Sequence, residues 1–122
     1  MAIDCFLDRN NSIVFTTFSG EVSRTQLVRH AQRLVANTKF EPAFSQMIDL
    51  RELVRSDIGF HDLSLFAKEC DPFSETSKRA VLTSTDFAFG LARMYQGLKG
   101  DPDNFMYFKE MSAARRWLGL DR

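Results

Sequence analysis

Cysteine and histidine are scarce in this sequence, and their spacing is wrong for a redox pair or a metal site. The two cysteines, Cys5 and Cys70, belong to no C-x-x-C pattern, so neither a redox motif nor a zinc site is indicated. We expect both to be buried or half-buried free thiols. The two histidines, His30 and His61, have no further His, Cys or carboxylate at ligand spacing. The sequence therefore predicts no metal ion and no cofactor.

An excess of charge of one sign is missing, as are long apolar runs. Sixteen basic residues balance sixteen acidic residues, so no net field attracts a polyanion, and nucleic acid is not expected as a partner. No stretch approaches the roughly 18 consecutive apolar residues of a membrane helix, and the first residues lack the features of a signal peptide. We therefore expect a cytoplasmic protein without a membrane span.

The common catalytic motifs are absent as well. The sequence has no Gly-x-Ser-x-Gly elbow, no Gly-rich phosphate loop followed by Lys and Ser or Thr, and no Gly-x-Gly-x-x-Gly after a strand. No nucleophile can be paired with a base. The chain is predicted not to be an enzyme, and catalysis through Asp49, Asp57 or Asp86 is the lowest-ranked alternative.

The composition is that of one ordinary folded domain. The chain has 122 residues, of which 44% are apolar and 26% charged, which suits a single domain covering residues 1–122. Twelve phenylalanines stand against one tryptophan and two tyrosines. This balance indicates a Phe-rich core and raises the alternative of an apolar patch kept for a partner.

The apolar pattern predicts alternating strands and helices. We expect strands at residues 3–7, 13–18, 44–50, 78–83 and 104–108, with Ser19 and Gly20 ending the second. Helices are expected after the capping box Ser23 to Gln26, and over residues 58–70, 87–99 and 111–118. The first two strands suit a hairpin, and the later strands are separated by helices, which demands parallel pairing. The predicted fold is α/β, a mixed, mostly parallel five-stranded sheet flanked by about four helices.

The first predicted helix is amphipathic and carries a basic side. Its apolar residues at helical spacing are Leu27, Val28, Ala31, Leu34 and Val35. Arg24, Arg29 and Arg33 lie elsewhere on the helix and offer either a contact surface for an acidic partner or an ordinary solvated face.

Ligands of open α/β sheets bind beyond the carboxyl ends of the strands, and this rule selects a set of polar residues. We expect Asp49 near the end of its strand, followed by a polar, irregular stretch from Arg51 to Asp57. The residues selected are Asp49, Ser56, Asp57, Thr83, Ser84, Thr85 and Asp86. Two structural alternatives stay open: Thr85 or Asp86 caps the third helix, and Asp49 hydrogen-bonds a neighbouring amide.

The second and third helices contain more large apolar side chains than one buried face of each requires. These side chains line a pocket or a dimer contact, or they fill a Phe-rich core. They are Phe60, Phe66, Phe73, Phe87, Phe89, Met94 and Tyr95.

The order of elements and three segments resemble the SpoIIAA-like proteins of the STAS superfamily. The segments run from Met47 to Leu50, from Gly90 to Arg93 and from Phe108 to Leu118. The resemblance implies a STAS-like fold. Better known members are anti-sigma factor antagonists, switched by phosphorylation of a serine at the start of the helix that follows an Asp-Leu strand.

The switch serine of that pattern is missing or displaced here. Alignment on Gly59 places Asp57 at the serine position, with Ser56 one residue earlier. Two explanations remain: the chain binds a partner without a phosphoswitch, or Asp57 mimics the modified state permanently. The fold also resembles lipid-binding CRAL-TRIO domains, which implies a small apolar ligand as an alternative.

These observations together favour a non-enzymatic regulatory or protein-interaction module. Its predicted contact surface is the loop from Ser56 to Gly59, and its partner is a protein not identified by the sequence. The alternative is a carrier or sensor of a small apolar, lipid-like ligand. A homodimer is compatible with either hypothesis.

Overall fold

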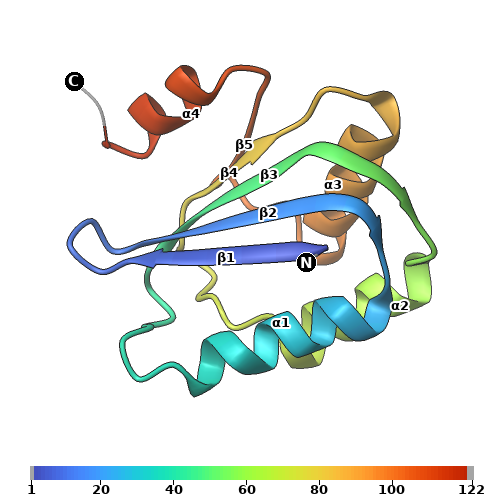
Figure 1. The fold of residues 1–122 in the computed structure, drawn as a ribbon, viewed down its shortest axis with the longest axis horizontal. Coiled ribbons are helices and arrows are strands. Elements are labelled where there is room, and N and C mark those ends of the chain that lie inside the picture. The colour runs from blue at the N-terminus through green and yellow to red at the C-terminus, as the bar shows by residue number, and fades with distance from the viewer. Residues whose placement is uncertain (1, 121–122) are drawn as a thin grey trace.

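The computed structural model describes residues 2–120 and contains a five-stranded sheet with helices on both faces (Figure 1). The strands lie in the sheet in the order of the chain, and the pair β1–β2 is antiparallel while the other pairs are parallel. This is the predicted mixed α/β fold. The elements are β1 (Ile3–Asp8), β2 (Ile13–Val22), α1 (Arg24–Ala36), β3 (Ser45–Ser56), α2 (Phe60–Leu65), the π-helix η1 (Phe66–Cys70), β4 (Arg79–Leu82), α3 (Asp86–Leu98), β5 (Phe105–Phe108) and α4 (Met111–Trp117).

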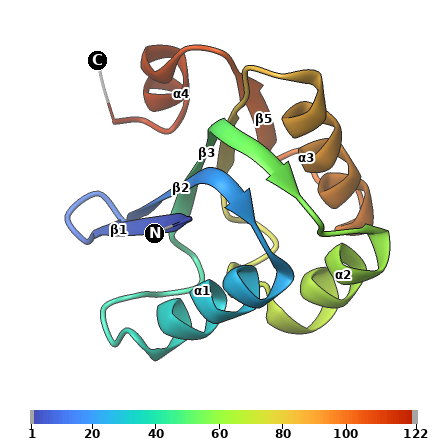
Figure 2. The same cartoon turned by 45° about the vertical axis from the view of Figure 1, so that its right-hand side comes forward.

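Three helices cover one face of the sheet, and α4 covers the other (Figures 1 and 2). Leu27 of α1, Leu63 of α2 and Ala88 of α3 are buried in the same cluster as Val81 of β4. On the opposite face, Ala114 of α4 packs in a second cluster with Ile13, Met47, Ala80 and Leu82. Because successive residues of a strand alternate between faces, the short β4 contributes to both cores.

The hairpin forms as predicted, but its second strand is longer than expected. Asp8 closes the turn by accepting hydrogen bonds from the backbone nitrogen (3.2 Å) and the side-chain nitrogen (2.8 Å) of Asn11. The prediction that Ser19 and Gly20 end the strand is wrong, because β2 continues to Val22. Gly20 has a φ of +66° beside irregularities in the β2–β3 register, so the strand bulges there and continues.

The third strand is also longer than predicted and runs to Ser56. Residues 51–56, expected to be irregular, pair with the end of β2, where Val22 lies opposite Ser56. The pairing with β4 reaches only Asp49. The second half of β3 therefore projects beyond β4 as a ribbon with β2, bending toward the layer of three helices (Figure 2). Its polar side chains are exposed, which explains why the sequence suggested a loop: Arg51, Glu52 and Arg55.

The buried face of α1 is narrower than the apolar pattern suggests. Leu27, Ala31 and Leu34 are buried, as predicted. Val35 is 64% exposed, so its expected inward position is wrong. At 3.6 residues per turn, Val35 lies about 80° around the helix from Leu27, outside the stripe that meets the sheet.

The helix ends follow the signals in the sequence. In the predicted capping box, Ser23 Oγ accepts from the Gln26 N–H at 3.3 Å, and the Gln26 side chain accepts from the Ser23 N–H at 2.8 Å. Thr85 Oγ1 accepts from the Ala88 N–H at 3.1 Å and caps α3. Gly119, with a φ of +81°, follows α4 as expected. Within residues 2–120, no helix is long and apolar enough to cross a membrane.

The two thiols differ in their environment. Cys70 is half-buried, as predicted, whereas Cys5 is exposed. The prediction for Cys5 is wrong because β1 is the edge strand of the sheet, so one side of the strand has no neighbouring strand to cover it.

Candidate functional site

The structure divides the predicted site into two groups of residues. Asp49 lies opposite the last residue of β4, near residues 83–86, which lead from β4 into α3. Ser56 lies seven positions later on β3, roughly 20 Å farther along an extended strand. The expectation that Asp49 marks the carboxyl end of β3 is wrong, because residues 51–56 continue the strand. The predicted residues therefore do not form one site.

Asp49 is engaged by the arginine two residues later. Its Oδ1 accepts hydrogen bonds from the backbone N–H and the Nε of Arg51, both at 3.0 Å, and its Oδ2 accepts from Nη2 at 2.8 Å. Burial acts to raise the pKa of Asp49, but the hydrogen bonds and charge of Arg51 outweigh it and hold that pKa below its usual value. The carboxylate is thus ionised and occupied by a local partner.

The polar residues at the start of α3 are used within the fold. Thr83 is buried. Ser84 Oγ donates to the backbone oxygen of Arg51 at 3.1 Å, which ties this segment to β3. Thr85 caps the helix, and Asp86 lies in its first turn, where a negative charge complements the helix dipole. The hydroxyls of Ser84 and Thr85 therefore both have partners within the fold.

The loop from Ser56 to Gly59 is held in one conformation by short-range hydrogen bonds. Ser56 Oγ donates to the backbone oxygen of Val22 at 2.7 Å and accepts from the Ile58 N–H at 3.1 Å. The Gly59 N–H donates to Asp62 at 3.0 Å. Ser56 is half-buried and Ile58 is buried, so the loop is anchored from beneath.

Large apolar side chains and one free carboxylate are exposed around this loop. Val54, at the end of β3, is 73% exposed, and Phe60, the first residue of α2, is 62% exposed. Asp57 between them is exposed and makes no hydrogen bond or ion pair with any residue from 2 to 120. We call Val54, Phe60 and the loop between them the 54–60 surface. Val54 was not singled out in the sequence because its exposure depends on the unpredicted ribbon, whereas Phe60 belongs to the predicted set of excess apolar side chains.

A cavity of about 110 Å³ lies between the sheet and the three helices on its face, directly under the 54–60 surface. Ser56 and Ile58 line the part below the loop. The rest of the lining is mostly apolar and includes Leu27, Leu63, Phe66, Val81, Leu91 and Phe105. A cavity of roughly 150 Å³ lined by such side chains can hold benzene, whereas drug-sized ligands occupy roughly 300–1,000 Å³. This cavity suits a single ring or a short alkyl chain.

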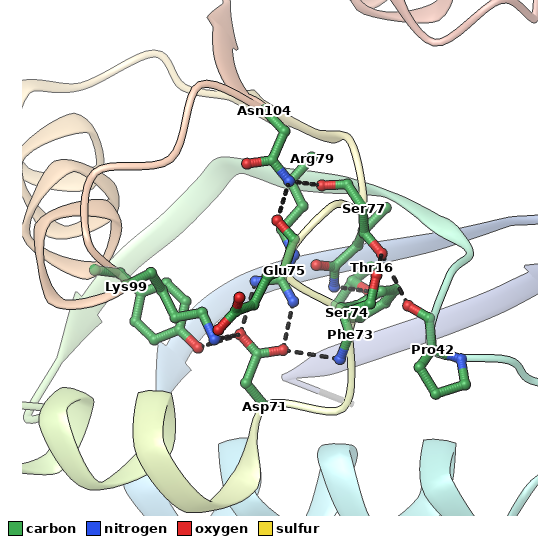
Figure 3. A network of polar contacts seen from close by, with 12 residues as sticks. Thr16, Pro42, Asp71, Phe73, Ser74, Glu75, Ser77, Arg79, Lys99 and Asn104 are labelled. Atoms are coloured by element: carbon green, nitrogen blue, oxygen red, sulfur yellow. Dashed lines mark hydrogen bonds and ion pairs between the residues drawn. The ribbon is translucent and has the colours of Figure 1, made fainter.

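A buried charge cluster contributes to the cavity wall through Asp71, Arg79 and Tyr95. Figure 3 shows the contacts of Asp71 and Arg79 within this cluster. Asp71, just after η1, accepts two hydrogen bonds from the guanidinium of Arg79, and their side chains are 1% and 4% exposed. Tyr95 Oη also donates to Asp71, and Lys99 Nζ lies 3.7 Å from it. Burial alone would raise the pKa of Asp71, but Arg79 and the other donors hold that pKa below its usual value. Burial and the nearby carboxylate raise the pKa of Tyr95 well above its usual range.

The guanidinium of Arg79 is further enclosed by aromatic rings. Its central carbon lies 4.6 Å from the ring centre of Phe73 and 5.4 Å from that of Phe105. The sequence prediction placed no role on Asp71 or Arg79. The available signal was an arginine at the start of the otherwise apolar strand Arg79–Leu82, since a buried charge requires a buried partner.

The polar groups around the cavity are already paired within the chain. Gln46 donates to Thr16 at 3.1 Å across two strands. Among residues 2–120, no buried side-chain nitrogen or oxygen lacks a hydrogen-bond partner. A charged ligand would therefore have to displace an existing bond, whereas an uncharged apolar molecule would not.

The Phe-rich set predicted for the second and third helices serves two different purposes. Phe66, Phe73 and Tyr95 line the cavity. The others are exposed: Phe60, Phe87, Phe89 and Met94. Phe89 still packs against the ring of Tyr107 at a centroid distance of 5.1 Å. The alternative of a lined pocket thus describes Phe66, Phe73 and Tyr95, and a Phe-rich core does not describe the four exposed side chains.

The described residues contain no cluster of side chains suited to bind a metal ion. No group of three His, Cys, Asp or Glu side chains between residues 2 and 120 is placed to hold a metal ion. His30 lies on α1 at the cavity wall, where burial lowers its pKa and the charge of Arg33 lowers it further.

Comparison with known proteins identifies the fold and no closer relationship. No protein-family model matches the chain, and no curated protein matches it. A solved structure does match: an uncharacterized protein of the DUF3478 family, with a SpoIIAA-like fold, from Shewanella loihica PV-4. The two chains share 19% sequence identity and superpose with a TM-score of 0.64, over 96% of this chain and 92% of the other.

Proposed function

The chain has a SpoIIAA-like fold, and from that premise we propose that it is a non-enzymatic protein-interaction module that binds its partner through the 54–60 surface. The observation that carries the proposal is the exposure of Val54 (73%) and Phe60 (62%) on either side of an anchored loop. Exposed apolar side chains beside a charged group are the usual composition of a contact centre with a polar rim.

The rigidity of the loop supports this role. Ser56 bonds to Val22 and Ile58, and Gly59 bonds to Asp62, so the surface is already ordered in the free protein. A preordered surface loses less conformational entropy when a partner binds. The same property favours a defined partner over non-specific association.

The hydrogen bonds of Ser56 favour partner binding without a phosphoswitch at that residue. Its hydroxyl is half-buried and engaged both as donor and as acceptor, so a phosphate there would break both bonds. Asp57 supplies a permanent negative charge at the position of the switch serine in the resembling family. We propose that the partner recognises Asp57 as it stands.

The non-enzymatic part of the proposal is supported by the surroundings of the three acids considered for catalysis. Asp49 is occupied by Arg51. Among residues 2–120, no hydrogen bond joins Asp57 or Asp86 to a histidine, serine or cysteine side chain. A general base and nucleophile within reach of each other are the geometric minimum for most hydrolytic and transfer reactions.

The test is a quantitative capture experiment with a matched control. Lysate of the protein's own host is passed over immobilised wild type, the double variant Val54→Glu/Phe60→Glu and the variant Val35→Glu. Val35 is an exposed valine on α1, outside the 54–60 surface. We expect a discrete protein enriched by wild type and by Val35→Glu and reduced at least tenfold by the double variant. Equal capture by all three would refute the 54–60 surface as the contact.

The cavity supports a second candidate function, the sensing or carrying of a small uncharged apolar molecule. Its volume of about 110 Å³ fits one ring or a short chain, and Arg79 offers no free charge to a lipid carboxylate because Asp71 occupies it. Native mass spectrometry of protein from its own host tests this candidate. A retained small molecule, lost in an Ala92→Met variant that narrows the cavity, would support it, and a clean apo mass would count against it.

A further inference from the structure

A second hollow, of about 540 Å³, lies on the outer side of the molecule between the edge strand β1 and the helix α1. Both elements run side by side in Figure 1, with α1 below β1. The hollow is lined on the strand side by Ile3, Cys5 and Leu7 and on the helix side by Arg29 and Arg33. It is separate from the 54–60 surface, which none of these residues belongs to.

The edge of β1 offers backbone groups for another strand. The Ser19 N–H donates to the Ala2 oxygen, and β1 pairs with β2 in antiparallel register. Since the two backbone groups of a residue point to the same side in an antiparallel pair, those of the even-numbered residues face β2. The N–H and C=O groups of Ile3, Cys5 and Leu7 therefore face away from the sheet. Such an edge accepts an added strand.

The helix side of the hollow is positively charged. Arg29 and Arg33 are exposed and one turn apart on α1, and neither makes an ion pair or hydrogen bond with any residue from 2 to 120. Asp4 is the acidic residue in the lining. By strand alternation, the side chain of Asp4 lies on the same face as Phe6, which packs on Phe15 under α4. The charge of the arginines is therefore not neutralised within the hollow.

We propose that β1 accepts an extended acidic segment of a partner protein as a sixth strand, with the carboxylates of that segment paired to Arg29 and Arg33. Four helical residues span about 6 Å, and alternate residues of a strand are about 6.7 Å apart. Acidic residues at every second position of the added strand thus match the two arginines. The intervening side chains face the opposite side of the sheet, where Phe6 is 64% exposed.

A second copy of this chain suits the edge less well. Pairing two β1 strands about a two-fold axis would continue one sheet through both copies, with both α1 helices on the same face. The four arginines would then gather on one side, and like charges across a contact weaken it. An acidic partner strand brings the opposite charge instead.

The probe is a fluorescein-labelled peptide of seven residues in which glutamate alternates with valine and threonine, together with a matched peptide that has lysine in place of glutamate. Fluorescence anisotropy with the full chain measures binding at low salt. Cys5→Pro removes an outward N–H that β2 does not use, and Arg33→Glu reverses one charge. Arg116→Glu, on α4, makes the same charge change on the other face. Thermal melting followed by circular dichroism confirms that each variant is folded.

We expect the wild type and Arg116→Glu to bind the glutamate peptide and not the lysine peptide, and Cys5→Pro and Arg33→Glu to lose at least tenfold in affinity. Wild-type affinity in Arg33→Glu, or equal binding of the lysine peptide, would overturn the proposal. So would no binding up to millimolar peptide, or a dimer in sedimentation that Cys5→Pro abolishes. Val54→Glu/Phe60→Glu should bind the peptide as wild type does, which separates this site from the 54–60 surface.

Discussion

The start of α3 and the 54–60 surface lie at comparable places in the fold, each where a strand of the sheet leads into a helix, but they use their polar groups differently. At the start of α3, Ser84 bonds to Arg51 and Thr85 caps the helix. Around the 54–60 surface, Asp57 has no partner among residues 2–120, and Val54 and Phe60 are exposed.

This difference separates residues that build the fold from residues that are left to meet a partner. A polar side chain that caps a helix start stabilises that helix by accepting a hydrogen bond from a free backbone N–H. An exposed large apolar side chain adds little to the stability of the fold, because it is not removed from water. The 54–60 surface is therefore the better candidate for a partner-binding site, although the sequence favoured the hydroxyl and carboxylate groups of Thr83 to Asp86.

The largest expected effect comes from removing the buried acid that supports the helices below the 54–60 surface. Asp71→Asn leaves the guanidinium of Arg79 buried without its counter-charge, and we expect unfolding free energy to fall by about 3–5 kcal/mol. Urea denaturation measures it. A loss below about 1 kcal/mol would show that the pair is not desolvated as its 1% and 4% side-chain exposures indicate.

The same acid gives a prediction for pH. Because the folded-state pKa of Asp71 lies below its unfolded value, its contribution is complete above the unfolded pKa of about 4 and is lost as pH falls through the folded pKa. Wild-type stability should drop in that acidic window, and the drop should be smaller in Asp71→Asn. Parallel acid-unfolding curves for the two proteins would contradict this account.

A charge reversal in each region sharpens the comparison directly. Asp57→Lys should weaken partner binding about tenfold, equivalent to about 1.4 kcal/mol, and change stability by less than about 0.5 kcal/mol because the residue has no structural partner. Asp86→Lys should leave binding unchanged and destabilise α3 by about 0.5–1 kcal/mol through the helix dipole. Binding titrations and urea melts on both variants measure the two effects. Weaker binding in Asp86→Lys with unchanged binding in Asp57→Lys would instead place the partner contact at the start of α3.

A pair of hydroxyl deletions gives effects of similar size to the charge reversals. Thr85→Ala removes the α3 cap and should cost about 1 kcal/mol of stability with no change in affinity. Ser56→Ala removes two hydrogen bonds of the loop and should cost a similar amount, about 1–2 kcal/mol, while also lowering affinity. Unchanged affinity in Ser56→Ala would mean that loop order does not contribute to binding.

The smallest predicted effect concerns the cavity wall. Burial lowers the pKa of His30, so between its folded pKa and about 6.5 the unfolded chain binds more protons, and stability falls as pH drops through this range. His30→Gln should remove this loss of stability between pH 7 and 5. His61→Gln, which changes an exposed histidine, is the control. If the stability of His30→Gln depended on pH as that of the wild type does, His30 would not be the source of this pH dependence.

Much of the fold could be predicted because local signals agreed with the tertiary arrangement. The capping box at Ser23, the Asp8 turn and the apolar run of β4 each specify an element without knowledge of its neighbours. The resemblance to SpoIIAA-like proteins predicted the fold that the comparison of structures supports. Element order then left few ways to arrange the sheet.

The projecting ribbon and the buried charge cluster could not be predicted. Residues 51–56 are polar, and they form a strand because β2 bulges at Gly20 and continues beside them. Asp71 and Arg79 are eight positions apart, and they meet because the chain after η1 brings Asp71 back to the first residue of β4. Both features depend on contacts between elements, which single-sequence periodicity does not encode.

Site-specific photo-crosslinking in the protein's own host tests the central claim most directly. A benzophenone side chain is introduced at Asp57 in one protein and at Asp86 in another, because both positions are exposed. We expect position 57 to give a discrete covalent adduct with one partner protein, and position 86 to give none. An adduct from position 86 alone, or the same adducts from both positions, would contradict the account of the 54–60 surface as the partner-binding region.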